Sequence, residues 1–224
     1  MKFNSSARGV VVIGRELWFP NPEIARATPC NRPVAIGGDL SPERLLLAYR
    51  MGIYPWSNNP VTWWSPDPRA IFDFDKFHIP RSLKRTLRRN VFVVTVNKAF
   101  RQVMLGCVRP QGWITPDFLV AYGRLHDLGF AHSIECWHDG ELAGGLYGVA
   151  IGGFFSAESM FHRKSDASKV AVCHLIQRLK ERGFVLCDIQ MLSAVTRQLG
   201  GIEIPRSEYL QRLKAAVDLP CSFV

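Results

Sequence analysis

Residues 140–171, GELAGGLYGVAIGGFFSAESMFHRKSDASKVA, decide the fold. Two apolar runs, 141–152 and 153–161, meet at a Gly-Gly pair, which predicts two consecutive strands. Asp166 then precedes an amphipathic run at 167–183, so we expect a long helix with Asp166 as its N-cap. Strands that lead into a helix of this length are typical of an α+β sheet with helices on its faces.

The flanking sequence extends this pattern in both directions. Residues 131–138 predict another strand, joined to the next one by Asp139-Gly140, a strong signal for a tight turn. Residues 184–190, FVLCDIQ, predict an apolar strand, and two short helices follow it. The other elements expected in this part are a strand at 91–96, a helix capped by Asn97 and a helix from Thr115 to Gly129.

The first part of the chain is different. Up to about residue 70 it is rich in Pro, Gly and Trp, and its one clear helix begins after Ser41 and ends at Gly52. We therefore expect a small, loop-rich N-terminal domain over residues 1–70. A larger α+β domain is expected over residues 71–224.

A short basic helix is expected between the two parts, at 80–90, PRSLKRTLRRN. Leu83 and Leu87, four residues apart, form its apolar side. The basic residues that cover the rest of it are Arg81, Lys84, Arg85, Arg88 and Arg89. The whole chain carries a net charge of +9, which favours a polyanionic partner: nucleic acid, anionic lipid or a phosphorylated small molecule.

Other features narrow the class of protein. No apolar run approaches the length of a membrane span, and the first residues show no signal-peptide pattern, so we expect a cytoplasmic protein. The six cysteines, among them Cys30, are scattered without a C-x-x-C pair. This favours reduced thiols and no metal site.

Asp188 and Gln190 are the first candidates for chemistry. If 184–190 is a strand, these side chains lie two residues apart on one face, near the strand's carboxyl end. Open sheets with flanking helices often bind ligands at that edge. An ion pair or a cap at the strand end is the alternative interpretation.

Glu158 is the second candidate, because it lies among Phe154, Phe155, Met160 and Phe161. A buried carboxylate needs a partner or takes up a proton. One interpretation is a salt bridge to the nearby Arg163 or Lys164, and the other is a carboxylate that binds substrate. Strict alternation puts Phe155 and Glu158 on opposite faces, so a shared pocket requires a β-bulge.

Trp56 and Trp113 fall next to Pro or Gly in segments expected to be loops. Exposed aromatic rings near a basic helix are typical of proteins that stack unpaired nucleobases. The alternative is that tryptophans fill the core of the small domain.

Taken in order along the chain, the motifs closely resemble the leucyl/phenylalanyl-tRNA–protein transferases from about Phe19 to Leu213. They are FPNPEIA, AIGGDLSPERLLLAYRMGIYPWS, WWSPDPRAIF, GELAGGLYGVAIGGFFSAESMF, SDASKVA, CDIQ and LGGIEIPRSEYL. The resemblance implies a domain with the fold of GCN5-related acetyltransferases (GNAT) behind a small N-terminal domain. It implies an enzyme that moves leucine or phenylalanine, and less readily methionine, from tRNA to a protein beginning with Arg or Lys. Such a product is degraded by the bacterial N-degron pathway.

The resemblance also implies roles for individual residues. Asp188 with Gln190 would orient and help deprotonate the acceptor amine, and Glu158 would hold the amino group of the aminoacyl moiety. The side chain of that moiety would lie among Leu146, Phe155, Leu175 and Cys187. The tRNA would contact Trp56, Trp113, Arg81, Lys84, Arg85, Arg88, Arg89 and Arg163. No metal, coenzyme A or other cofactor is implied, and we expect a monomer.

The chain departs from the family after the D-x-Q triplet. Ser193 and Val195 stand where the family usually has Asn or Thr and then His. The alternative function is therefore a GNAT-like protein that binds tRNA, with altered acceptor specificity or without catalytic activity.

Overall fold

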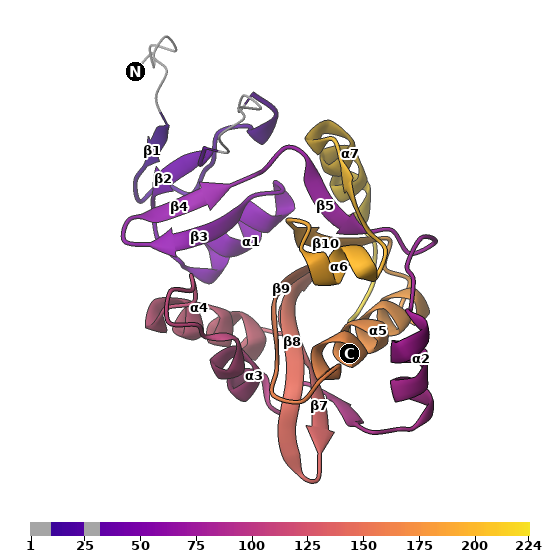
Figure 1. Ribbon diagram of the computed structural model, residues 1–224. Helices are drawn as coiled ribbons and strands as arrows, with labels where there is room; N and C mark the ends of the chain where they lie inside the picture. The colour runs from indigo at the N-terminus through magenta and orange to yellow at the C-terminus, as the bar shows by residue number, and fades with distance from the viewer. Residues whose placement is uncertain (1–9, 25–31) are drawn as a thin grey trace, which may run out of the picture.

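The structure, a computed structural model, describes residues 10–24 and 32–224, so Cys30 lies outside it. Within these ranges, seven strands form one mixed sheet in the spatial order β11-β5-β10-β9-β8-β7-β6 (Figure 1). The strands are β5 (Arg69–Phe72), β6 (Val93–Val96), β7 (Ala131–His138), β8 (Glu141–Ile151), β9 (Phe154–His162), β10 (Leu186–Gln190) and β11 (Gly201–Ile204). β7, β8 and β9 pair antiparallel in sequence order, as residues 140–171 predict, whereas β10 pairs parallel with β9.

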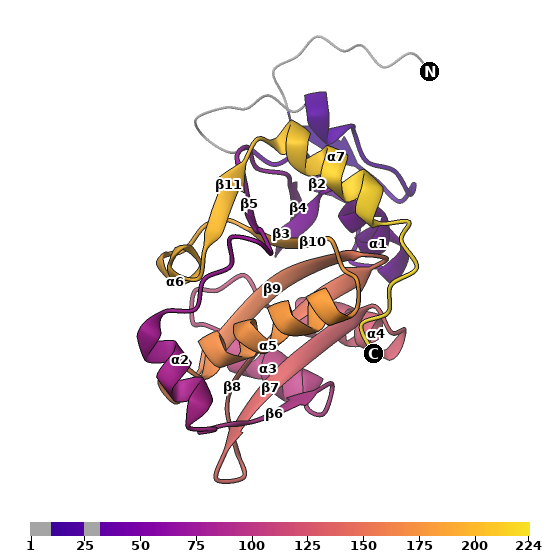
Figure 2. The same cartoon turned by 90° about the vertical axis from the view of Figure 1, so that its right-hand side faces the viewer.

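Helices cover both faces of this sheet. α3 (Phe100–Cys107) and α4 (Pro116–Asp127) lie on one face and α5 (Ala167–Glu181) on the other, as Figures 1 and 2 show together. The remaining helices of this part are α2 (Arg81–Arg88), α6 (Ala194–Gln198) and α7 (Arg206–Ala216). The predicted α+β class is confirmed. Across the described residues, every helix is too short or too polar to cross a bilayer.

The N-terminal part contains a second sheet, although its sequence indicates mostly loops. Its strands follow the order β1-β2-β4-β3. The elements are β1 (Val11–Ile13), η1 (Pro22–Ile24), β2 (Ala35–Gly37), α1 (Pro42–Arg50), β3 (Tyr54–Asn58) and β4 (Val61–Trp64). Trp63 is 0% exposed and belongs to the same apolar cluster as Tyr122 of α4, so the two parts share a core. The boundary near residue 70 stays a prediction.

Three predicted helix starts agree with the structure and one does not. Ser41, Thr115 and Asp166 occupy the N-cap positions of α1, α4 and α5. The predicted cap at Asn97 is wrong, because α3 begins at Phe100. Asn97 instead accepts a hydrogen bond at Oδ1 from the Ser133 backbone N–H at 2.9 Å, which ties the end of β6 to β7. A polar side chain at a strand end thus serves the sheet rather than the next helix.

A β-bulge lies in β9 at Glu158, where a pocket shared with Phe155 would require one. Ala157 pairs with Gly148 and Ser159 pairs with Tyr147, which leaves Glu158 without a partner on β8. A Cβ at Gly148 would collide with the backbone of β9, so this glycine permits the close approach.

β10 is irregular at the same level of the sheet. Its register against β5 shifts between Asp188 and Gln190. Its pairing with β9 covers residues 186–188 against 154–156, and β9 then continues to His162 paired with β8. The polar residues of both strands therefore lie where β9 and β10 part.

Candidate active site

Asp188 is the centre of a buried ion pair. It is 0% exposed, and its partner Arg69 on β5 is 1% exposed. Arg69 donates from Nε to Oδ1 at 2.9 Å and from Nη2 to Oδ2 at 2.6 Å. The Gln190 backbone N–H donates to Oδ1 and the Tyr209 hydroxyl to Oδ2, each at 2.9 Å. These bonds fill the roughly four acceptor positions of a carboxylate, so the ion-pair interpretation of Asp188 agrees with the geometry.

Arg69 is held by further contacts. Its Nη1 donates to the Gly52 carbonyl at 3.1 Å, and its guanidinium lies over the rings of Tyr54 and Tyr209 at 4.8 and 4.5 Å. Burial alone would lower the pKa of Arg69, but the adjacent Asp188 raises it above its ordinary value. The pair is therefore a fixed plus–minus unit in the core.

Gln190 connects the two strands. Its Nε2 donates to Ser156 Oγ at 2.8 Å and to Glu158 Oε1 at 3.2 Å, both on β9. Its φ of 53° lies in the left-handed region, which non-glycine residues rarely adopt. The backbone N–H reaches Asp188 while the amide reaches across to β9. Asp188 and Gln190 are thus joined through the Gln190 backbone, and the expectation that their side chains project side by side stays a prediction.

The groups of the described residues that donate hydrogen bonds to Glu158 are neutral. Ser156 Oγ donates to Oε1 at 2.8 Å, and the Tyr122 hydroxyl donates to Oε2 at 3.2 Å. Burial raises the pKa of Glu158 to about 7, although the hydrogen bond from Ser156 opposes that rise. This carboxyl group therefore changes its protonation state near neutral pH.

The predicted salt-bridge alternative for Glu158 is wrong. Arg163 Nη1 donates to the Leu142 carbonyl at 3.2 Å, and Lys164 Nζ lies 2.6 Å from Nε2 of His138. Both cations belong to the exposed loop between β9 and α5. They remain available to a partner outside the molecule.

The two candidate tryptophans lie together, next to Glu158. Trp56, which is on β3 rather than in a loop, stacks on Trp113 with ring centroids 6.2 Å apart at 20°. Trp113 in turn lies 6.3 Å from the ring of Tyr122, whose hydroxyl bonds to Glu158 and to Tyr49. Trp56 is 38% exposed, so a planar ligand has access to this stack.

The four expected pocket residues also lie together, but on the opposite face of the sheet. They belong to the apolar cluster under α5, and each is at most 2% exposed: Leu146, Phe155, Leu175 and Cys187. Phe155 and Cys187 are register partners on β9 and β10. Glu158 instead contacts Tyr122 of α4, so the bulge does not bring Phe155 and Glu158 onto one face.

The basic residues of α2 form an exposed surface. Leu83, 1% exposed, anchors the helix, and Thr86 Oγ1 donates to Asp166 Oδ2 at 3.0 Å. This contact ties α2 to the start of α5, close to the loop that carries Arg163 (Figure 2). The side chains of Arg81, Lys84, Arg85, Arg88 and Arg89 are all exposed.

Ser193 has a local structural role. Its Oγ accepts the Thr196 backbone N–H at 3.1 Å, and the Thr196 hydroxyl accepts the Ser193 N–H at 2.9 Å. These reciprocal bonds form a capping box at the start of α6. Val195 is half-buried and packs on the cluster under α5.

Several partners of the candidate residues were not predicted from the sequence. They are Arg69, Tyr209, Ser156, Tyr122 and Tyr49. A basic residue beside an apolar strand, as in the motif WWSPDPRAIF, is a signal that could have identified Arg69. The tyrosines come from distant helices and have no local signal.

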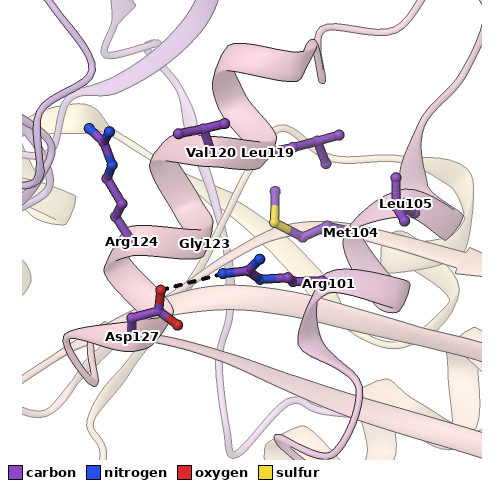
Figure 3. Close-up of a pocket in the computed structure, with 8 residues that line it drawn as sticks. All are labelled: Arg101, Met104, Leu105, Leu119, Val120, Gly123, Arg124 and Asp127. Carbon is purple, nitrogen blue, oxygen red and sulfur yellow. Dashed lines mark hydrogen bonds and ion pairs between the residues drawn. The ribbon is translucent and has the colours of Figure 1, made fainter.

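A hollow of about 400 Å³ lies between α3 and α4, away from these residues (Figure 3). Its lining residues are Arg101, Met104, Leu105, Leu119, Val120, Gly123, Arg124 and Asp127. None of them is a predicted site residue. The described part of the chain also has no cluster of three or more His, Cys, Asp or Glu residues able to hold a metal ion.

Solved structures similar to this chain include a GCN5-related N-acetyltransferase from Kribbella flavida. It is 11% identical with a TM-score of 0.40, and the match covers 75% of this chain and 63% of that one.

Comparison with sequence families and curated proteins gives far closer matches. The family model described as leucyl/phenylalanyl-tRNA protein transferase matches residues 71–214, and the model of its N-terminal domain matches residues 38–67. The leucyl/phenylalanyl-tRNA–protein transferase of Syntrophotalea carbinolica is 51% identical over 82% of this chain and 83% of its own length. That of Desulfatibacillum aliphaticivorans is 46% identical over 94% and 93%. The chain belongs to the leucyl/phenylalanyl-tRNA–protein transferase family.

Proposed function

We propose that this protein transfers leucine or phenylalanine, and less readily methionine, from aminoacyl-tRNA to the N-terminal Arg or Lys of acceptor proteins. The observation that carries the reaction class is the family match over nearly the whole chain. We further propose that transfer takes place where β9 and β10 part, next to Glu158 and Gln190. The protein would act as a cytoplasmic monomer and mark its acceptors for degradation.

The chemistry makes modest demands on the protein. An aminoacyl ester is already activated, so transfer needs an oriented, unprotonated amine and donors for the developing oxyanion. An N-terminal amine has a pKa of about 8 and is partly neutral near pH 7. As the C–N bond forms and the ester C–O bond breaks, the amine proton passes to the released tRNA hydroxyl.

Glu158 is suited to bind the amino group of the transferred amino acid. Its carboxylate would accept a hydrogen bond from the amino group of the leucyl or phenylalanyl moiety. The three neutral donors around it would be redistributed when that amino group arrives: Ser156, Gln190 and Tyr122. With a pKa of about 7, Glu158 is also basic enough to relay the proton of the acceptor amine.

Asp188 and Gln190 would orient the acceptor amine. Because all acceptor positions of Asp188 are filled, it would act through Gln190, whose backbone N–H it holds. The Gln190 amide then presents its carbonyl oxygen where β9 and β10 part. In this arrangement Asp188 positions Gln190 and does not itself take the proton of the acceptor amine.

The aminoacyl group would lie across the separation of β9 and β10. Its amino group would meet Glu158 on the α4 face, and its side chain would enter the apolar cluster of Leu146, Phe155, Leu175 and Cys187 on the α5 face. An apolar pocket discriminates by shape and size, which allows both Leu and Phe. The terminal adenosine would stack on the Trp56–Trp113 pair.

Transfer is tested with radiolabelled Leu-tRNA and a peptide that begins with Arg. The matched control is the same peptide with its N-terminal amine acetylated. We expect labelled product from the first peptide alone. Absence of product with freshly charged tRNA and an active control enzyme would overturn the proposal. Equal binding of charged and uncharged tRNA without transfer would favour the non-catalytic alternative, which Ser193 and Val195 motivate.

The α2 surface is tested by salt dependence. In the double variant Arg85→Gln/Arg88→Gln, tRNA affinity should fall, and the slope of log Kd against log salt should decrease by about 1–2, since each lost phosphate contact changes it by about 0.7–0.9. Arg101→Gln/Arg124→Gln on α3 and α4 removes the same charge elsewhere (Figure 3). An equal loss of tRNA affinity in both variants would show that the net charge of the protein attracts tRNA and that α2 forms no specific site.

A further inference from the structure

Phe223, in the segment that follows α7, is inserted into the core behind Phe155. It is 3% exposed although its neighbours in sequence are accessible. Its ring stacks on Phe155 with centroids 5.2 Å apart at 24°, and on His132 at 4.5 Å and 22°. Phe184 meets its edge at 6.3 Å and 89°. The Phe155 ring therefore packs directly against a residue far from it in sequence.

The end of α5 holds this segment in place. Arg178 Nε donates to the Phe223 carbonyl at 2.7 Å, and its guanidinium lies 5.2 Å from the centre of the Phe223 ring. Arg182 Nη1 donates to the Val224 carbonyl at 3.3 Å. Leu175 of the expected pocket also belongs to α5. The same helix therefore holds the segment that carries Phe223 and forms part of the pocket.

Free space also borders Phe223. A cavity of about 160 Å³ is lined by Phe223 together with His132, Ala150 and residues on either side of them. Ala150 is the register partner of Phe155 on β8. The Phe223 ring stacks on both Phe155 and His132 and borders this cavity, so it fills space that Phe155 could otherwise occupy.

We propose that Phe223 is a specificity-determining residue, which sets the depth of the aminoacyl pocket by backing Phe155. This inference rests on the proposed function, in which Phe155 lines that pocket. A smaller residue at 223 would let Phe155 move into the space that the Phe223 ring now fills and lengthen the pocket. A longer pocket favours the phenylalanyl over the leucyl group, because discrimination in an apolar pocket follows the volume filled.

The test compares kcat/KM for one tRNA body charged with leucine or with phenylalanine, so that the donors differ only in the transferred side chain. Phe223→Leu should raise the Phe/Leu ratio by about tenfold or more, within the range that one methylene group gives in an apolar pocket. Arg178→Gln, which releases the segment without altering the core, should raise it in the same direction by less. Phe184→Leu is the matched control and should change both donors by the same factor.

Phe155→Leu distinguishes the possible failures. If Phe155→Leu shifts the ratio and both Phe223→Leu and Arg178→Gln leave it unchanged, the role of Phe223 is overturned and the pocket stands. If no variant shifts the ratio although wild type transfers both amino acids, the pocket assignment falls together with the inference. An equal shift in Phe184→Leu would show a general softening of the core and would also overturn the role of Phe223.

Discussion

Asp188 and Glu158 are carboxylates on neighbouring strands, and their surroundings differ completely. Asp188 faces a guanidinium, a hydroxyl and a backbone N–H and has no exposed surface. Glu158 faces hydroxyls and an amide, keeps partial exposure, and has its pKa raised by burial to about 7. Asp188 is held in a buried ion pair, whereas Glu158 changes charge near neutral pH.

The difference teaches that burial alone does not assign a chemical role. A buried carboxylate with a bidentate cation stays ionised and rigid, and removing either partner leaves an uncompensated charge. A buried carboxylate with neutral donors exchanges protons at little cost near its raised pKa. In the proposed function, the first supports the site and the second serves its chemistry.

The largest expected effect is the loss of folding stability when the ion pair between Asp188 and Arg69 is broken. Asp188→Asn leaves Arg69 charged and buried, which should lower the free energy of unfolding by about 3–5 kcal/mol. Urea unfolding measures this loss. Replacing both partners, Asp188→Leu with Arg69→Met, should restore much of it, since no buried charge is left. A single variant as stable as wild type would show that the pair is not the fixed unit described.

Glu158→Gln should have the opposite effect on stability, in a way that depends on pH. The pKa of Glu158 is raised to about 7 from an ordinary value of 4.5. Between these two pH values the folded protein therefore holds a proton that the unfolded chain has released. Stability contributed by this group is present below about pH 4.5 and lost as pH rises through 7. The variant should therefore gain on wild type across this window, by up to about 3 kcal/mol. Denaturant unfolding at pH 5 and pH 8 checks the sign, and a gap that shrinks with pH would contradict it.

Glu158→Gln should also slow transfer. Loss of a proton-relaying carboxylate costs about a hundredfold in rate, within the range for general acid–base groups. Single-turnover transfer from Leu-tRNA at saturating peptide measures it, with Glu141→Gln, an exposed glutamate, as the control. A loss confined to tRNA binding would assign Glu158 to binding and not to the chemical step.

The smallest expected effect is that of Tyr122→Phe on the pKa of Glu158. The Tyr122 hydroxyl donates to Glu158 and lowers its pKa, so removing it should raise that pKa by about half to one unit. Carbon-13 NMR of labelled glutamate carboxyls follows the shift directly. Tyr209→Phe removes the equivalent hydroxyl from Asp188 and should leave the Glu158 titration in place. A larger shift from Tyr209→Phe would mean that the two carboxylates titrate together.

Local patterns predicted much of this molecule. Alternation and turn residues in 131–161 predicted the antiparallel strands, and Asp166 predicted the start of α5. Glu158 and Asp188 were identified because a carboxylate among apolar residues is unusual in any strand. The bulge at Glu158 was anticipated as a requirement, although it does not place Phe155 on the same face.

What the sequence could not supply is the set of partners from distant segments. Arg69 lies 119 residues from Asp188, and no local pattern predicts that β5 pairs with β10. The different surroundings of the two carboxylates arise from that pairing and from the helices that bring Tyr122 and Tyr209. The sequence patterns identified both acids, and the family resemblance implied that Asp188 with Gln190 helps deprotonate the amine. The acceptor positions of Asp188 are filled in the structure, which is why we propose Glu158 for the proton instead.

The central claim is that Glu158 serves the chemistry and Asp188 the architecture. The most direct test measures single-turnover leucine transfer and melting temperature together for Glu158→Gln and Asp188→Asn. The account predicts that Glu158→Gln loses about a hundredfold in transfer without a lower melting temperature, whereas Asp188→Asn loses melting temperature and transfer together. Full transfer by Glu158→Gln, or an Asp188→Asn variant that melts like wild type yet transfers nothing, would contradict it.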